Sequence, residues 1–186
     1  MRNSTILFIF FGLIFGGAVL FAFVYLPKID ANSGLDTSKL SLELPVDVVD
    51  MRYDERGVVP FCLEKNVGID IQARENSSVF APVGGAVTNI YPESKRIAIQ
   101  ATNGVYVYVN SVKNMRVEVG DYVSQGDVLG QIDGISVRFT VDNQLDKRYE
   151  CPFLYLNDTS KGYLSEGLKQ STNSSKRICE CSGFSY

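Results

Sequence analysis

The chain opens with an apolar segment that suits a lipid bilayer better than a small protein core. Residues 6–26 read ILFIFFGLIFGGAVLFAFVYL and contain no charged side chain. As a helix, a run of this length spans about 31 Å, close to the hydrocarbon thickness of a membrane. Tyr25 stands where interfacial aromatic residues belong, and Pro27 and Lys28 follow directly. A cleaved signal peptide is the competing interpretation, but its apolar core is normally shorter. We predict an uncleaved membrane anchor over residues 1–27.

The orientation and pairing of this anchor are weakly encoded. Arg2 precedes the segment and Lys28 follows it, so the positive-inside rule hardly separates the two orientations. We place the C-terminal bulk outside the cytoplasm, mainly on the cysteines and on the resemblance given below. Gly12 and Gly16 form a G-x-x-x-G spacing that lets two helices approach closely, so a homodimer is one hypothesis.

The absence of histidine limits the chemistry open to this chain of 186 residues. Histidine is the commonest metal ligand and the usual base near neutral pH. Without it, Ser-His-Asp and Cys-His catalysis and every imidazole zinc site are excluded. A net charge of −3 without a basic cluster also argues against nucleic acid as a partner. The length allows one domain with an anchor and tails.

The number of cysteines is even, which is compatible with disulfides in an oxidising compartment. Free thiols in a cytosolic protein are the alternative. Four cysteines allow three pairings, and a bridge between the neighbours Cys179 and Cys181 would be strained. We expect Cys62 to pair with Cys151, because these two flank the folded region. The four residues are Cys62, Cys151, Cys179 and Cys181.

Short β segments separated by turns fill residues 57–156. The runs at 86–90, 96–100, 105–109 and 137–141 are rich in β-branched residues. Asn103-Gly104 lies between two of these runs and is a strong hairpin signal. No stretch of this region has a helical period. The pattern predicts an all-β domain, either an antiparallel sandwich or a barrel.

The two flanks of this domain are poorer in apolar residues. Residues 28–56 resemble a stalk or linker, in which the run LSLELPVDVV could form one strand. Residues 157–186 are rich in Ser, Asn, Lys and Gly. We expect this polar segment to be a mobile or loosely docked tail, which Cys179 or Cys181 could tie down.

Several motifs in fixed order resemble the lysostaphin-type (LytM-like) zinc metallopeptidases, which cut peptide cross-links in bacterial cell walls. The family patterns are H-x-G-x-D, A-P-x-x-G-x-V, Y-x-H-L, V-x-x-G-D-x-V-x-x-G-x-x-I-G, H-x-H-F-E-V and P-x-x-Y-L. The resemblance covers about half of the chain and implies a duplicated hybrid motif, a barrel-sandwich-like antiparallel domain, here behind one N-terminal transmembrane helix. The corresponding segments begin at Asn66, Ala81, Tyr108, Val117, Ser136 and Pro152.

The departures from this family fall on its functional residues. The resemblance assigns zinc binding to the positions of Asn66, Asp70 and Arg138. It assigns the two assisting histidines to the positions of Asn110 and Ser136. Only Asp70 keeps a ligand type, whereas a catalytic zinc normally needs three protein ligands. The resemblance therefore implies a degenerate member with no metal, no cofactor and no hydrolase activity.

Arg138 leads to a hypothesis about what replaces the metal. If the motifs align, its guanidinium enters the space of the zinc ion and faces Asp70 as a permanent cation. An ion pair between Arg138 and Asp70 would then be the local cross-link. In the alternative, Arg138 points to solvent and Asp70 only caps a turn.

The resemblance favours a binding, scaffold or regulatory protein at the cell envelope. Degenerate members of the family bind and activate other cell-wall enzymes, so an envelope protein or a peptidoglycan peptide is the expected partner. A groove lined by Tyr106, Tyr108 or Phe139 would support such binding.

Two other functions stay open. Asp70, Asp121 and Asp127 could carry unorthodox acid–base chemistry, although acidic residues beside glycine usually form turns. Residues 79–133 also resemble lipoyl or biotinyl carriers and export-pump adaptors. In a carrier Lys113 would bear the cofactor, but its surroundings differ from the usual Asp-Lys or Met-Lys context.

Overall fold

Strands that alternate between buried and half-buried residues form the centre of the molecule. The alternation is strict in β2 (Ile69–Gln72) and in β6 (Val105–Asn110). Between them lies β10 (Ser136–Asn143), which pairs antiparallel with both neighbours. Because successive side chains of a strand point to opposite faces, one face of these strands is apolar and packs inward. The other face carries polar and aromatic residues.

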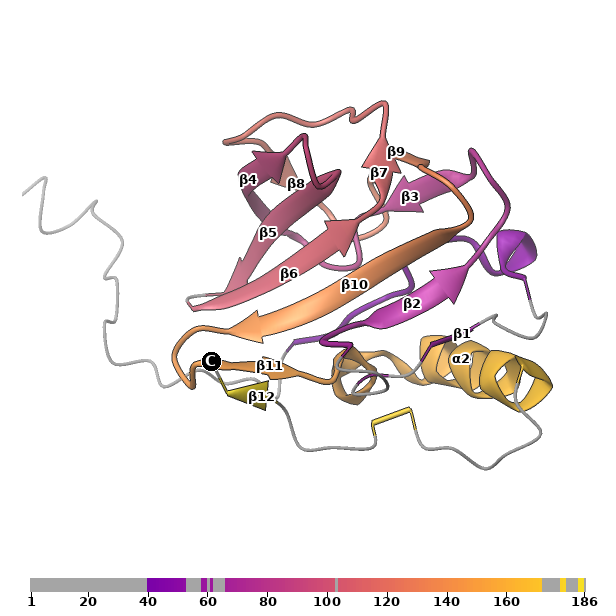
Figure 1. Cartoon of the computed structure of the whole chain (residues 1–186). Coiled ribbons are helices and arrows are strands. Elements are labelled where there is room, and N and C mark those ends of the chain that lie inside the picture. The colour runs from indigo at the N-terminus through magenta and orange to yellow at the C-terminus, as the bar shows by residue number, and fades with distance from the viewer. Residues whose placement is uncertain are drawn as a thin grey trace, which may run out of the picture. The chain divides into compact units, whose positions relative to one another are not determined.

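The computed structural model describes residues 40–52, 58–59, 61, 66–102, 104–171, 178–179 and 184–185. Within these ranges, a nine-stranded sheet has the main order β1-β2-β10-β6-β5-β4-β8, while β11 pairs with β10 and β12 pairs with β11. A three-stranded sheet has the order β3-β9-β7 (Figure 1). The remaining strands are β1 (Val58–Val59), β3 (Ser78–Phe80), β4 (Gly85–Tyr91), β5 (Arg96–Thr102), β7 (Val112–Lys113), β8 (Tyr122–Val123), β9 (Val128–Ile132), β11 (Arg148–Glu150) and β12 (Phe184–Ser185).

The pairings within both sheets are antiparallel, as the sequence predicts. The hairpin predicted at Asn103-Gly104 joins β5 to β6, and Gly104 adopts the positive φ that such a turn requires. All four predicted strand runs lie inside observed strands. The prediction of an antiparallel β domain is therefore confirmed, with one helix added to it.

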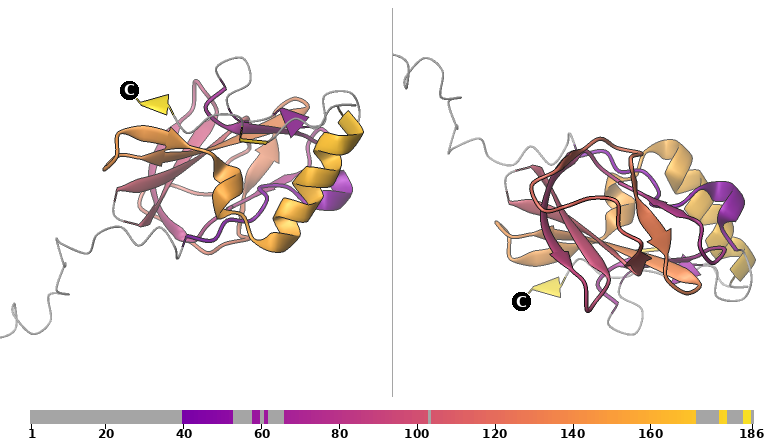
Figure 2. Two further views of the ribbon diagram at one scale, coloured as in Figure 1. Left: turned by 90° about the horizontal axis from the view of Figure 1, so that it is seen from below. Right: turned by 90° about the horizontal axis from the view of Figure 1, so that it is seen from above.

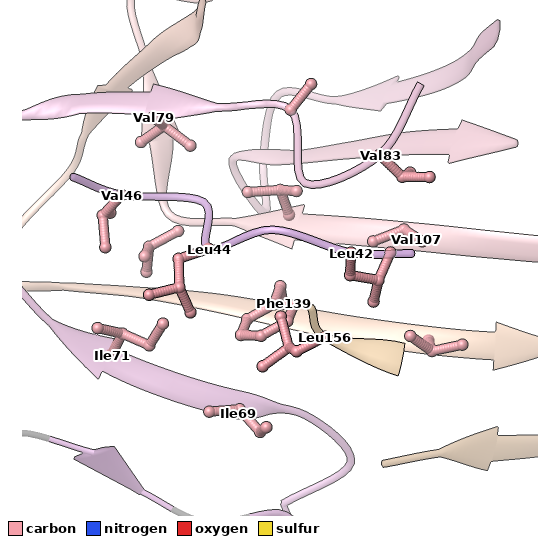
Figure 3. Close-up of a cluster of buried hydrophobic side chains, with 14 of the residues drawn as sticks. Leu42, Leu44, Val46, Ile69, Ile71, Val79, Val83, Val107, Phe139 and Leu156 are labelled. Carbon is pink, nitrogen blue, oxygen red and sulfur yellow. The ribbon is translucent and has the colours of Figure 1, made fainter. Parts of the chain in front are cut away.

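One apolar cluster joins the two sheets. Val79 of the small sheet and Phe139 of the large sheet are both fully buried. Figure 3 shows side chains from β2, β3, β6 and β10 that converge on the same interior. This burial supplies the main driving force for stacking the sheets.

The segment predicted to be a stalk enters this core. Leu42, Leu44 and Val46 are 0%, 8% and 3% exposed, and Figure 3 shows them between the two layers. Leu42 forms a parallel bridge with Leu156. The run does not form a regular strand, and it ends in the 3-10 turn η2 (Val48–Asp50). The expectation of a linker is wrong for this part of the range, because its alternating apolar residues fill space between the sheets.

Residues 158–171 of the expected mobile or loosely docked tail form a helix. After the turn η4 (Pro152–Tyr155), α2 (Asp158–Ser171) lies beside β1 (Figure 1), along one side of the domain (Figure 2). The Asn157 side chain accepts a hydrogen bond of 2.8 Å from the Ser160 backbone, which caps the first turn. Leu164 is fully buried and anchors the helix. The expectation of a mobile segment is therefore wrong for residues 158–171, because the buried Leu164 and the cap hold a helix there. The expected tie through Cys179 is confirmed by its disulfide with Cys151.

Neither the predicted membrane span nor the Gly12 and Gly16 spacing is in the part of the chain that the structure describes. Within that part, no helix is long and apolar enough to cross a bilayer. The anchor and the homodimer therefore stay predictions.

Candidate functional site

The polar face of the large sheet brings three of the predicted site residues into one row. Arg138 of β10 lies directly opposite Asp70 of β2 on one side. On its other side it lies opposite Asn110 of β6. Directly opposite residues of neighbouring strands share a face, so these three side chains project together away from the core.

Arg138 and Asp70 form a bidentate ion pair. Nε of Arg138 donates to Oδ1 of Asp70 at 2.5 Å, and the terminal nitrogen Nη2 donates to Oδ2 at 2.7 Å. The Asp70 side chain is 16% exposed and that of Arg138 is 42% exposed. The hydrogen bonds to Asp70 raise the pKa of the Arg138 guanidinium above its usual value. Of the two hypotheses for these residues, the ion pair is confirmed.

Asn66 adds a second contact to the same carboxylate. Its side-chain nitrogen donates to Oδ2 of Asp70 at 3.3 Å, and its side-chain oxygen accepts from the Gly68 backbone at 3.2 Å. Asn66 is only 8% exposed. A Cβ on Gly68 would lie 2.6 Å from the Phe139 carbonyl oxygen, so the turn holding Asn66 packs directly on β10. These local contacts thus hold Asn66 and Asp70 in place beside Arg138.

The two positions expected from the assisting histidines lie on the same face. Ser136 stands opposite Gln72, two residues before Arg138 on β10. Oδ1 of Asn110 is buried, and no described residue gives it a hydrogen bond. The structure therefore brings Asn66, Asp70, Asn110 and Arg138 together, with Ser136 at the edge of the group.

The residues predicted to line a groove do not all lie on the same face of the large sheet. Phe139 is fully buried and belongs to the core, so the prediction for this residue is wrong. It follows Arg138 on β10 and therefore points the opposite way. Tyr106 and Tyr108 are half-buried on the polar face, where Tyr108 lies opposite Thr140. The Tyr108 hydroxyl donates to Asp142 at 3.3 Å.

One feature of this face was not predicted from the sequence. The guanidinium carbon of Arg96 lies 4.3 Å from the ring centre of Tyr91 and 4.8 Å from that of Tyr108. Tyr91 of β4 is directly opposite Arg96 of β5. The alternation of β5 could have placed Arg96 on the polar face, but its aromatic partners depend on strand pairing.

The acidic residues considered for catalysis have structural roles. Asp121 accepts a hydrogen bond of 2.8 Å from the Glu118 backbone, and Asp127 accepts one of 2.7 Å from the Ser124 backbone. Each stands after a glycine of positive φ, at Gly120 and Gly126. Both carboxylates thus close turns, and Asp70 is occupied by Arg138.

Lys113, the residue expected to carry a cofactor in a lipoyl-type domain, lies in β7 and not in an exposed turn between strands. Its side chain is 28% exposed, and its amino group is 3.9 Å from carboxylate oxygens of Glu75 and Asp133. These ion pairs hold the amine to the surface of the domain. The arrangement gives no support to a carrier function.

A disulfide joins Cys151 to Cys179. The predicted bridge between Cys62 and Cys151 is therefore wrong. The reason is that residues 178–179 return beside Phe61, whose backbone donates to the Ile178 carbonyl oxygen at 3.1 Å. This return places Cys179 next to Cys151. Cys62 and Cys181 are outside the described residues.

Comparison with known families agrees with this geometry. The sequence profile described as Peptidase family M23 matches residues 64–143. This segment contains β2 to β10 and the whole row from Asp70 to Asn110. Residues 64–143 are therefore similar to peptidase family M23. No curated protein matches the sequence.

The solved structures to which this chain is similar are distant from it in sequence. Csd3 from Helicobacter pylori is 17% identical over 70% of this chain and 41% of that chain, with a TM-score of 0.51. A putative peptidase M23 from Pseudomonas aeruginosa is 22% identical over 56% of this chain and 45% of that one, with a TM-score of 0.45. The chain thus covers less than half of each of these two proteins.

The zinc ion that this fold family implies does not fit the residues present. Of the three positions that would bind it, only Asp70 offers a carboxylate, and both of its oxygens accept hydrogen bonds from Arg138. A guanidinium has no lone pair for a metal. The Asn66 amide also turns its NH₂ group toward Asp70. Within the described residues no group of three or more His, Cys, Asp or Glu side chains could hold a metal ion.

Proposed function

We propose that this protein is a membrane-anchored pseudopeptidase, an M23-type domain that acts as a binding, scaffold or regulatory protein at the cell envelope. The observation that carries the proposal is the pair of hydrogen bonds from Arg138 to both oxygens of Asp70. In a zinc peptidase the metal activates water by lowering its pKa to about 7. A guanidinium at the same place supplies no such nucleophile, and Arg138 stays protonated at every physiological pH.

The other residues near the ion pair support the loss of hydrolysis. Asn110 and Ser136 stand where the resemblance puts assisting histidines, and neither an amide nor an unactivated hydroxyl acts as a general base near neutral pH. The fold and its polar face nevertheless persist around them. A sheet face that keeps its shape but lacks catalytic groups is suited to bind a ligand without hydrolysing it.

Two features support a location outside the cytoplasm. The apolar run at residues 6–26 has the length of a membrane span. The disulfide between Cys151 and Cys179 is of the kind that persists in an oxidising compartment. Membrane fractionation followed by protease treatment of intact cells tests this part of the proposal. Digestion of the C-terminal domain only after the cells are opened would contradict it.

A cell-wall assay tests the proposed function directly. The full-length chain is incubated with purified, dye-labelled peptidoglycan, with and without added zinc. We expect dye release no greater than that of a buffer control, together with co-sedimentation of the chain with the wall or capture of an envelope protein from solubilised membranes. Lysostaphin serves as the active control, because it shows that the substrate can be cut. Zinc-dependent release of dye above the buffer level would overturn the proposal.

A further inference from the structure

Arg96 is a cation without an anionic partner among the described residues. Its guanidinium rests near the rings of Tyr91 and Tyr108. Ring faces attract the charge, but they do not accept the in-plane hydrogen bonds that a guanidinium donates. Nε of Arg96 is buried and has no hydrogen-bond partner there. An unsatisfied buried donor costs free energy, so the site gains when an acceptor arrives.

Asn110 is the neighbour of Arg96 on the polar face. Ile97 of β5 pairs with Val109 of β6, so the next antiparallel step puts Arg96 opposite Asn110. The pairings of Tyr91 with Arg96, of Asn110 with Arg138 and of Arg138 with Asp70 then extend the row across five strands.

The row therefore holds a donor and an acceptor that both lack hydrogen-bond partners in the part of the chain that the structure describes. Nε of Arg96 needs an acceptor, and the buried oxygen of Asn110 needs a donor. Arg138, on the other side of Asn110, is neutralised by Asp70 and does not compete for an anion. A ligand that fits must carry a negative acceptor and an N–H group close together.

The last residue of a peptide carries these two groups. Its backbone N–H and its carboxylate flank one Cα, with the nitrogen and the carboxyl carbon about 2.5 Å apart. Neighbouring strands lie about 4.8 Å apart, and each hydrogen bond adds about 2.9 Å. One terminal residue can therefore reach Arg96 and Asn110 together. A bare anion satisfies the guanidinium but leaves the Asn110 oxygen without a donor.

We propose that Arg96 and Asn110 form a binding site for the free carboxyl end of a peptide. The carboxylate accepts charge-assisted hydrogen bonds from Arg96, and the amide of the same residue donates to Asn110. Tyr91 and Tyr108 position the guanidinium between them. This inference rests on the proposed binding function and gives its partner a chemical class.

An NMR titration of the full-length chain tests this site. The probe is acetyl-Ala-Ala with a free carboxylate, compared with the same peptide as a C-terminal amide and with the free acid methylated on its last amide nitrogen. The readout is the Nε–H signal of Arg96 in protein labelled with ¹⁵N-arginine, assigned by its loss in Arg96→Lys. We expect the free acid to shift this signal saturably and both altered peptides to bind about tenfold more weakly.

Variants separate the site from general electrostatics. Arg96→Lys keeps the charge but loses the planar fork, and Asn110→Ala removes the acceptor. Each is expected to weaken binding of the free acid about tenfold. Arg116→Lys, at an exposed position, is the matched control and should bind as the unchanged protein does. The comparison of acid with amide uses unchanged protein, so it stands even where a variant folds poorly.

Three results would overturn the inference. Equal affinity for acid and amide would remove the role of the carboxylate. An unmoved Arg96 signal would remove the site. Inorganic phosphate that shifts the signal as strongly as the peptide, with no effect of Asn110→Ala, would reduce it to a simple anion site. If the probe fails while the chain still sediments with the wall, this inference alone is lost. Wall hydrolysis would sink the proposed function and leave the titration interpretable.

Discussion

Arg138 and Asp70 face each other across β10 and β2 and are joined by two parallel hydrogen bonds of 2.5 and 2.7 Å. They connect the central strand of the large sheet to its neighbour toward β1. The resemblance to the lysostaphin-type peptidases assigns zinc binding to both of these positions. Here a permanent organic cation cross-links the same two strands.

Breaking this cross-link should destabilise the domain. Arg138→Gln leaves the mostly buried Asp70 carboxylate with only the weak bond from Asn66. We expect a loss of about 1–3 kcal/mol in the free energy of unfolding, measured by urea denaturation. Arg74→Gln breaks an exposed pair with Asp50 and is the matched control, with an expected loss below about 0.5 kcal/mol. Equal losses in the free energy of unfolding for the two substitutions would show that the Arg138–Asp70 pair stabilises the domain no more than an exposed ion pair does.

Returning two histidines should create a metal site. In the double variant Asn66→His and Arg138→His, two imidazoles join Asp70 as a three-ligand set. We expect about one zinc ion per chain after dialysis, measured by elemental analysis, against a background level in the unchanged protein. Circular dichroism checks that the variant is folded. A folded double variant that retains no zinc would mean that these three positions do not converge on a metal site.

Gly68 is required by close packing. A Cβ there would lie 2.6 Å from both the Phe139 carbonyl oxygen and the Thr140 hydroxyl oxygen, so Gly68→Ala must push the turn away from β10. We expect a loss of about 2–4 kcal/mol by urea denaturation. Gly162→Ala in the exposed part of α2 meets no atom within 4 Å and should instead gain about 0.5–1 kcal/mol. A neutral Gly68→Ala would show that the turn is not held against the strand.

The disulfide should stabilise the C-terminal region by constraining the unfolded chain. Cys151 and Cys179 are 28 residues apart. A closed loop of this size is worth about 3–4 kcal/mol in the chain-entropy description. The double variant Cys151→Ser and Cys179→Ser should lose about that amount in urea denaturation under non-reducing conditions. A loss below about 1 kcal/mol would indicate that packing alone holds residues 178–179 in place.

Tyr108 should make stability fall at alkaline pH. Burial, with a smaller effect of Asp142, raises the pKa of its phenol in the folded protein. The folded state therefore keeps the proton more tightly than the unfolded chain, whose tyrosine pKa is about 10. Stability from this group is complete below that value and is lost as the pH rises above it. Tyr108→Phe should show a shallower fall above about pH 10 than the unchanged protein.

Tyr122→Phe is the control for this experiment, because Tyr122 is 79% exposed. Its removal should leave the slope of stability against pH unchanged. If Tyr108→Phe and Tyr122→Phe have the same slope, the Tyr108 phenol titrates normally in the folded protein.

The strands were predictable because their burial follows the local pattern. In β6, alternation of Val105, Val107 and Val109 with polar or aromatic residues marks one apolar face. The same period in β10 explains why Arg138 points away from the core. The alternation of a strand therefore predicts which face a residue occupies. The prediction that Phe139 lines a groove did not follow this alternation, which puts Phe139 on the face opposite Arg138.

The flanks were less predictable because their structure depends on distant contacts. Leu42 and Leu44 alternate as a strand would, yet they are buried by packing between two sheets, with an isolated bridge from Leu42 to Leu156 in place of a regular strand. Leu164 is a fully buried apolar residue in a helix in which polar residues predominate. Such isolated anchors carry little signal until the surface they contact is known.

The sequence predicted which residues lie at the site, but it predicted only some of the contacts between them. Motif spacing predicted that Asp70 and Arg138 share the place that the resemblance assigns to zinc, and opposite charge then suggested their pairing. The contact between Tyr91 and Arg96 depends on strand register. A bulge between Val87 and Asn89 shifts that register by a step that the sequence does not reveal.

Leu42 also determines how the domain would respond to a pull from its N-terminal side. Its backbone donates to Tyr155 at 2.8 Å and accepts from Asn157 at 3.0 Å, while the Glu43 backbone donates to Pro82 at 2.9 Å. Tension entering along the chain would load these bonds and the buried leucines together. A mechanical load from an attached segment would thus act first on the interior of the domain. The sheet face with Arg138 would keep its shape until the hydrogen bonds of Leu42 and Glu43 broke.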